Sequence, residues 1–144
     1  MDWKNVCVAV LCGAMAVACG AGQTGTSASA SCEDFDLDVK KVWNAEVKLE
    51  LDTSFKKMGG TIGGSTLEEV STQMDQVTLN WVMLRQSACK DHFNRGVGTE
   101  EEYQRRVGCF DDFLKQHRTL LTALKSSDPT ALQQLLSADP GTCR

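Results

Sequence analysis

The segment LEEVSTQMDQVTLNWVMLRQSA, at residues 67–88, has the most regular apolar pattern in the chain. Its apolar residues recur at alternating intervals of three and four, at Leu67, Val70, Met74, Val77, Trp81, Leu84 and Ala88. This spacing is typical of the seam along which a helix packs against its neighbours. Ser65 and Glu68 have the spacing of a capping box just before the pattern. The segment therefore predicts a long, packed helix.

A second amphipathic segment precedes this helix. Its apolar residues fall every four positions, at Phe35, Val39, Trp43, Val47, Leu51 and Phe55. Lys, Glu and Asp stand between them, and Gly59-Gly60 ends the pattern, as glycine often does beyond a helix C-terminus. We expect one continuous helix from about Asp34 to Met58.

Two more helices are expected after residue 88. Thr99 and Glu102 have capping-box spacing ahead of a third long helix. The apolar residues of that helix are Tyr103, Val107, Phe110, Leu114, Leu121 and Leu124. Asp128 and Pro129 then have the positions of an N-cap and a first helical residue in a short fourth helix. Because short connections make neighbouring helices antiparallel, residues 32–144 are predicted to form an all-α up-down bundle of three long helices and one short one.

Cysteine is unusually frequent, with seven residues in a chain of 144. Folding the first two predicted helices together brings Cys32 close to Cys89, and folding the fourth helix back onto the third brings Cys143 to the level of Cys109. We therefore expect the disulfides Cys32–Cys89 and Cys109–Cys143. The alternative, Cys89–Cys109 with Cys32–Cys143, stays open at this point.

The N-terminal segment accounts for the remaining cysteines. Val6 to Ala18 is an apolar run that is too short to span a bilayer and has the length of a signal-peptide core. The small residues before Cys19 resemble the lipobox of bacterial lipoproteins, although Ala16 stands where leucine is usual. The resemblance implies that residues 1–18 are a signal peptide and that Cys19 carries a lipid. Residues 19–31, rich in Gly, Ser, Thr and Ala, would then be a flexible tether.

Cysteine parity agrees with lipidation of Cys19. Removal of residues 1–18 discards Cys7 and Cys12, and the lipid occupies Cys19. An even set of four cysteines is left for disulfides in an oxidising compartment. A plainly secreted protein and an uncleaved membrane anchor are the alternatives.

The composition limits the classes of partner. Charged residues make up 24% of the chain, and the formal net charge is −4. No basic stripe of the kind that binds nucleic acid is present, so no nucleic-acid partner is expected. A chain of this length accommodates a single domain.

The order of tryptophans, arginines and cysteines resembles a helical domain of myxobacterial envelope proteins. That domain lies in the extracytoplasmic part of many membrane-anchored serine/threonine kinases, ahead of tetratricopeptide repeats. The matching residues are Trp43, Phe55, Trp81, Arg85, Ala88, Cys89, Arg106, Cys109 and Cys143, and Phe110 replaces the usual leucine. The resemblance covers about residues 32–143. Since neither a kinase domain nor repeats are present, it implies an envelope location and no catalytic activity.

Three residue patterns could hold a ligand, and each has a simpler explanation. The glycine-rich GGTIGGS at residues 59–65 lacks the lysine of a phosphate-binding loop and is expected to be a flexible interhelical loop. Asp34, Asp36 and Asp38 lack the glycine and glutamate of a calcium loop, whereas acids suit the first turn of a helix.

The third pattern is a potential zinc set of Cys89, His92, Cys109 and His117. In an oxidising compartment disulfides are favoured over zinc, and His117 lies on an apolar stripe, where a histidine is usually a satisfied core residue. We therefore expect no metal and no cofactor. Because no nucleophile has a base at a suggestive spacing, we also expect no enzymatic activity.

One surface feature bears on partners. Leu79 and Met83 lie four residues apart on the side of the residue 67–88 helix opposite its seam. They either pack beneath a neighbouring helix or form an exposed patch for a protein partner.

The function expected from these features is that of a lipid-anchored, non-enzymatic binding module of the bacterial cell envelope, accessory to envelope signalling. Its partners would be the membrane, through the N-terminal lipid, and an envelope protein. It would lie on the periplasmic or outer side of a bacterial membrane. A structural envelope lipoprotein and a small metal-binding periplasmic protein are the alternatives, and the oligomeric state stays open.

Overall fold

The computed structural model describes residues 31–144. The predicted signal peptide, Cys19 and all of the predicted tether except Ser31 lie outside the described residues. The described part is all-α in character, with one small β-hairpin. None of its helices is long and apolar enough to cross a membrane.

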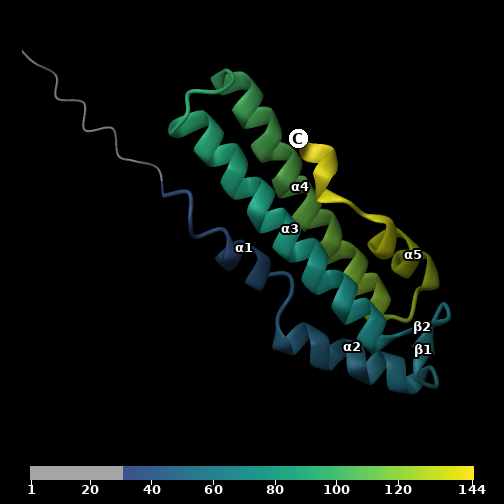
Figure 1. The fold of residues 1–144 in the computed structure, drawn as a ribbon. Helices are drawn as coiled ribbons and strands as arrows, with labels where there is room; N and C mark the ends of the chain where they lie inside the picture. Colours follow the sequence, from purple (N-terminus) through teal and green to yellow (C-terminus); the bar gives the residue numbers. More distant parts are fainter. Residues whose placement is uncertain (1–30) are drawn as a thin grey trace, which may run out of the picture.

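Two long antiparallel helices, α3 (Leu67–Phe93) and α4 (Glu100–Lys125), form the axis of the fold (Figure 1). The capping box predicted for α4 is confirmed: the Glu102 amide donates to Thr99 Oγ1 over 3.1 Å, and the Thr99 amide donates to Glu102 Oε2 over 2.8 Å. The box predicted for α3 is wrong by one residue, because Thr66 and Glu69 form it. Ser65 lies in a strand and is not available as the N-cap.

The helix predicted from Asp34 to Met58 is broken into α1 (Asp36–Lys40) and α2 (Ala45–Lys57). The break arises at Asn44, whose backbone is extended and whose side-chain oxygen accepts a hydrogen bond from the Val47 amide over 3.0 Å. Asparagine favours this N-cap geometry over a helix interior because its side chain competes for backbone groups. As a result α2 runs obliquely across one end of the α3–α4 pair rather than alongside it (Figure 1).

The glycine-rich connection between α2 and α3 contains a β-hairpin, which the sequence analysis did not predict. Strands β1 (Thr61–Ile62) and β2 (Ser65–Thr66) pair antiparallel. Gly63 and Gly64 connect them with φ angles of +57° and +87°, a conformation that glycine adopts without strain. Ile62 is only 2% exposed, which fixes the hairpin to the core.

The C-terminal segment packs back onto α4, as predicted. Helix α5 (Pro129–Ser137) starts at the expected N-cap, where Asp128 Oδ1 accepts from the Thr130 amide over 2.8 Å. Leu132 and Leu135 of α5 are completely buried. The short 3₁₀ helix η1 (Pro140–Cys143) then brings Cys143 to α4.

Both predicted disulfides are confirmed. Cys32 is bonded to Cys89 and Cys109 to Cys143, with Cα–Cα distances of 5.7 and 5.5 Å. Cys32–Cys89 holds the start of the described chain against the last turns of α3. Cys109–Cys143 holds the 3₁₀ helix η1 against α4.

The seam of α3 forms the centre of the core. Val70, Met74, Trp81 and Ala88 are buried, and the Trp81 indole N–H donates to the Phe110 carbonyl of α4 over 2.9 Å. The rings of Trp81 and Phe110 meet edge to face, with centroids 6.0 Å apart. This geometry is favourable for aromatic pairs and satisfies the buried indole donor.

Candidate functional site

The candidate site lies at the end of the α3–α4 pair where residues 94–99 connect the two helices. A stack of aromatic and cationic side chains begins there with Arg85, which is only 8% exposed. Its guanidinium carbon is 4.4 Å from the ring centre of Phe35 and 5.7 Å from that of Tyr103. Its Nη1 donates to the Tyr103 hydroxyl over 3.3 Å. Within residues 31–144 no carboxylate pairs with Arg85, so the aromatic faces stabilise its charge.

His92 continues the stack on the other side of Tyr103. The two rings are nearly parallel, with centroids 4.6 Å apart. His92 Nε2 lies 2.8 Å from Glu100 Oε2 in the first turn of α4. The hydrogen bond from Gln104 lowers the pKa of Glu100, desolvation opposes this, and the contact with His92 lowers it further. The stack therefore ties the last turn of α3 to the first turns of α4.

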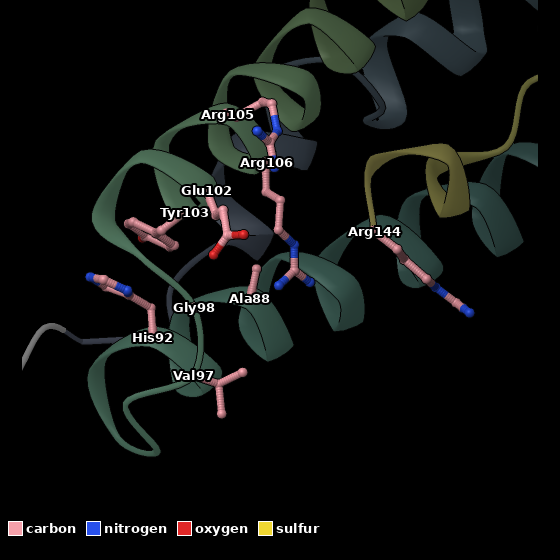
Figure 2. A pocket seen from close by; sticks show the side chains of 9 residues that line it. All are labelled: Ala88, His92, Val97, Gly98, Glu102, Tyr103, Arg105, Arg106 and Arg144. Atoms are coloured by element: carbon pink, nitrogen blue, oxygen red, sulfur yellow. The ribbon is translucent and has the colours of Figure 1, made fainter.

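A cavity of about 250 Å³ lies beside this stack (Figure 2). Helix α3 contributes Ala88 and His92, the connection contributes Val97 and Gly98, and α4 contributes the larger polar side chains. These are Glu102, Tyr103, Arg105 and Arg106, and Arg144 lies at the rim. The cavity thus has apolar groups, one carboxylate and several guanidinium groups within a small volume.

Two residues that line this cavity each have a buried side-chain nitrogen without a hydrogen-bond partner, Arg106 Nε and His92 Nδ1. In residues 31–144 the only other such side-chain atom is His117 Nε2. Buried polar groups in folded proteins nearly always have a partner, so two such atoms in neighbouring residues distinguish this end of the α3–α4 pair from the rest of residues 31–144.

The carboxylate in the cavity is held in place by the helix cap. Glu102 Oε2 accepts from the Thr99 amide, and this backbone hydrogen bond is the main cause that lowers the pKa of Glu102. The carboxylate is therefore ionised at neutral pH. Glu102 and Arg106 are four residues apart on α4, a spacing at which ion pairs form readily, yet they make no ion pair.

The residues predicted as a partner patch lie elsewhere on α3. Leu79 is 62% exposed and Met83 is 60% exposed, so neither packs beneath another helix. They are solvent-facing apolar side chains one helical turn apart.

The potential metal ligands are not brought together. Cys89 and Cys109 belong to different disulfides, and His117 is 1% exposed in the core. Asp36 and Asp38 pair with Lys40 and Lys41 of the same segment, at 2.5 and 2.8 Å. Within residues 31–144, no three His, Cys, Asp or Glu residues are arranged to hold a metal ion.

His117 differs from the expectation of a satisfied core histidine. Its Nδ1 donates to the Phe113 carbonyl over 2.9 Å, which leaves Nε2 as a buried acceptor without a donor. Burial lowers the pKa of His117, and the hydrogen bond to Phe113 opposes this only in part. The ring is therefore neutral at neutral pH.

Sequence reasoning did not identify the cavity. Arg85 and Arg106 stand among the residues that carry the myxobacterial resemblance, but no role followed from it. The spacing of Glu102 and Arg106 was the one local signal, and by itself it predicts an ordinary surface ion pair.

The charged side chains that line the cavity can orient a small polar ligand. In the described part of the chain, neither histidine accepts a hydrogen bond from a hydroxyl or a thiol. No protein-family model, curated protein or solved structure matches this chain.

Proposed function

We propose that this protein is a lipid-anchored, non-enzymatic binding module of the bacterial cell envelope, accessory to envelope signalling proteins. The observation that carries the proposal is the pairing of all four cysteines between residues 31 and 144 into two disulfides. Disulfides of this kind persist in oxidising compartments. Cys19, at the end of an apolar run and after small residues, is then the cysteine suited to lipidation.

Substitution of the lipidation cysteine tests the anchor. Cys19→Ala should abolish labelling of the full chain by radioactive palmitate and move the protein from the membrane fraction to the soluble fraction. Cys12→Ala, in the same apolar segment, is the matched control and should leave both properties unchanged. A Cys19→Ala protein that stays labelled or membrane-bound would contradict the proposed anchor.

The exposed pair Leu79 and Met83 is proposed as the surface for a protein partner. Two large apolar side chains on a solvent-facing turn lose contact with water when a partner covers them, which favours association. The exposure of both side chains supports this assignment.

Site-specific crosslinking tests this surface. A photo-crosslinking residue at Met83 should give a discrete adduct in intact envelopes, whereas one at exposed Thr119 of α4 should not. The Leu79→Glu substitution should remove the adduct. An adduct that consists of two copies of this chain would favour the structural, self-associating alternative over a separate partner.

A further inference from the structure

A groove of about 600 Å³ is lined by residues of α1, α3 and α4 and shares none of them with the cavity beside the His92–Tyr103 stack. Most of its lining side chains are charged. They are Asp38 and Lys41 at the end of α1, Arg85 of α3, and Asp111, Lys115 and Arg118 of α4. Cations outnumber carboxylates here, although the whole chain has a formal net charge of −4. The groove is therefore a cationic site on an acidic protein.

Only one of the cations in the groove is paired. Lys41 Nζ lies 2.8 Å from Asp38 Oδ1. Asp111 and Lys115 have a spacing at which ion pairs form readily on a helix, yet they make none. Within residues 31–144, Arg85 and Arg118 also lack a carboxylate partner. Three cations and one carboxylate are thus left unpaired, an excess of two positive charges.

Arg85 is the one charged lining residue that is buried, and its side chain is held in place. The rings of Phe35 and Tyr103 lie 4.4 and 5.7 Å from its guanidinium carbon, and Nη1 donates to the Tyr103 hydroxyl. Nε and Nη2 donate to no group within residues 31–144. Neither nitrogen is among the fully buried atoms without a partner, so both reach accessible surface. Since Arg85 lines the groove, this edge of the guanidinium is available to a ligand there.

We propose that this groove binds a phosphate monoester. Nε and Nη2 form one edge of the planar guanidinium, and such an edge binds two oxygens of an oxyanion at once. Arg85 takes two phosphate oxygens in this way, and Lys115 and Arg118 stabilise the remaining charge. A phosphate monoester carries a charge of about −2 at neutral pH, which matches the excess of two positive charges.

The unpaired charges favour a dianion over other ligands. A monocarboxylate would leave one positive charge uncompensated, and a cation would be repelled by the three unpaired cations. A buried charge without a counterion costs folding free energy, which the rings of Phe35 and Tyr103 offset only in part. A bound phosphate supplies the missing counterion. This inference goes beyond the proposed function, since it depends neither on the lipid nor on the Leu79–Met83 surface.

Titration of the oxidised, ¹⁵N-labelled full chain in non-ionic detergent micelles tests the proposal. Inorganic phosphate is the probe, acetate is the planar monoanion for comparison, and sodium chloride keeps the ionic strength constant. Phosphate should shift the amide signals of Lys41, Arg85 and Leu114 in a saturable manner, with acetate binding at least about fivefold weaker. Absence of saturation, equal affinity for acetate, or shifts confined to Val97 and Gly98 would overturn the proposal.

Exposed charges on α4 provide variants that leave the core intact. Lys115→Gln and Arg118→Gln should each weaken phosphate binding about threefold, because each removes one attractive charge. Asp111→Asn should strengthen it by a similar factor, because it removes the unpaired carboxylate. The matched control Lys57→Gln, at an exposed position of α2, should change the affinity less than about 1.5-fold. An unchanged affinity when both α4 cations are replaced would refute the assigned site.

The guanidinium edge is tested by Arg85→Lys. This variant keeps the charge but lacks the planar fork, so it should weaken phosphate binding at least about tenfold. An affinity like that of the wild type would refute the role of the Nε–Nη2 edge. Where Arg85→Lys disturbs the amide spectrum generally, the exposed variants on α4 decide the question, because they do not alter the core.

Two esters identify the source of the phosphate once inorganic phosphate binds. Glycerol 3-phosphate represents a soluble metabolite, and phosphatidic acid added to the micelles represents a lipid headgroup. Saturable shifts with glycerol 3-phosphate assign a soluble ester, and the same shifts with phosphatidic acid alone assign the membrane. Binding of neither ester would overturn the proposal. Each of these results leaves the palmitate experiment on Cys19 unaffected, so this proposal and the proposed function fail independently.

Discussion

The two ends of the α3–α4 pair are closed by different kinds of side chain. At one end α2, the β-hairpin and α5 cover the pair with apolar groups, and Phe55, Ile62 and Leu132 are almost fully buried. At the other end the covering groups are polar or aromatic, with Arg85, His92 and Tyr103 stacked around a cavity. We call these the apolar end and the polar end.

The difference separates stability from recognition. Burial of apolar surface stabilises the apolar end without requiring that any polar group find a partner. At the polar end the unpartnered, buried nitrogens of His92 and Arg106 instead cost folding free energy. Substitutions at the apolar end should therefore affect mainly folding, and those at the polar end mainly binding.

The largest expected effect is at the apolar end. Phe55→Ala should lower the free energy of unfolding by about 3–5 kcal/mol, because it leaves a cavity among fully packed groups. Urea denaturation followed by circular dichroism measures this. The matched variant is Phe93→Ala at the polar end, where residue 93 is 49% exposed. It should lower the free energy of unfolding by less than about 1.5 kcal/mol, because only edge-to-face ring contacts are lost. Equal losses from the two variants would remove the distinction between the ends.

The two disulfides give the next largest effect. Replacing either pair of cysteines with alanine should lower the free energy of unfolding by about 2–4 kcal/mol. Since the bridges span 57 and 34 residues, the chain-entropy model predicts a difference of only about 0.5 kcal/mol between them. Urea denaturation of the two double variants tests this. If only the variant without Cys109 and Cys143 lost stability, the Cys32–Cys89 bridge near the polar end would not contribute to the free energy of unfolding.

Acid should weaken the fold through His117, with a smaller effect. Because burial lowers its pKa, the folded protein binds fewer protons than the unfolded chain once the pH falls below about 6.5. The contribution of His117 is therefore intact above about pH 6.5 and declines as the pH falls towards the folded-state pKa.

Denaturation midpoints between about pH 7 and pH 5 measure this decline. His117→Leu should flatten it. A decline that persists unchanged in His117→Leu would show that the acid sensitivity does not come from His117.

The smallest expected effect is at the exposed pair on α3. Leu79→Glu with Met83→Glu should change the free energy of unfolding by no more than about 0.5 kcal/mol, because both side chains already face water. Met74→Glu, on the buried seam of the same helix, is the matched control and should prevent folding. Thermal melting separates the two results. Strong destabilisation by the exposed pair would show that this surface supports the fold.

Much of the fold could be predicted because it depends on local patterns. The period of α3 and α4, the Thr99–Glu102 box and the Asp128–Pro129 start are each encoded within a few residues. Antiparallel helix lengths favoured the observed disulfides but left the alternative pairing open. Their prediction held although the first helix did not, since its break at Asn44 did not move Cys32 away from Cys89.

Two local errors have identifiable causes. The apolar period continues through Asn44 and concealed the competition between its side chain and the helix backbone. Gly63-Gly64 between Ile62 and Ser65 is a known two-residue hairpin signal, but the neighbouring Gly59-Gly60 made the whole segment look like a loop. The helix break at Asn44 and the hairpin at Gly63-Gly64 could therefore both have been predicted from the sequence.

The cavity is a different case, because no sequence pattern contains it. Its geometry requires His92 from α3, Gly98 from the connection and Arg106 from α4 to meet in space. Glu102 accepts from the Thr99 amide and makes no ion pair with Arg106, although their spacing on α4 favours one. Properties of this kind emerge only when the elements are packed.

The order of the two disulfides also sets how the chain carries mechanical tension. A pull between Cys32 and Cys143 crosses directly to Cys89, follows the backbone to Cys109 and crosses directly again. Only about 20 residues, with a contour length of about 70 Å, lie on this load path, against about 370 Å for the same stretch without bridges. Helices α1, α2 and α5, most of α3 and the second half of α4 lie outside this path, within covalently closed loops. The segment under tension includes the connection that forms the cavity, so stretching would deform the polar end while the apolar end carried no load.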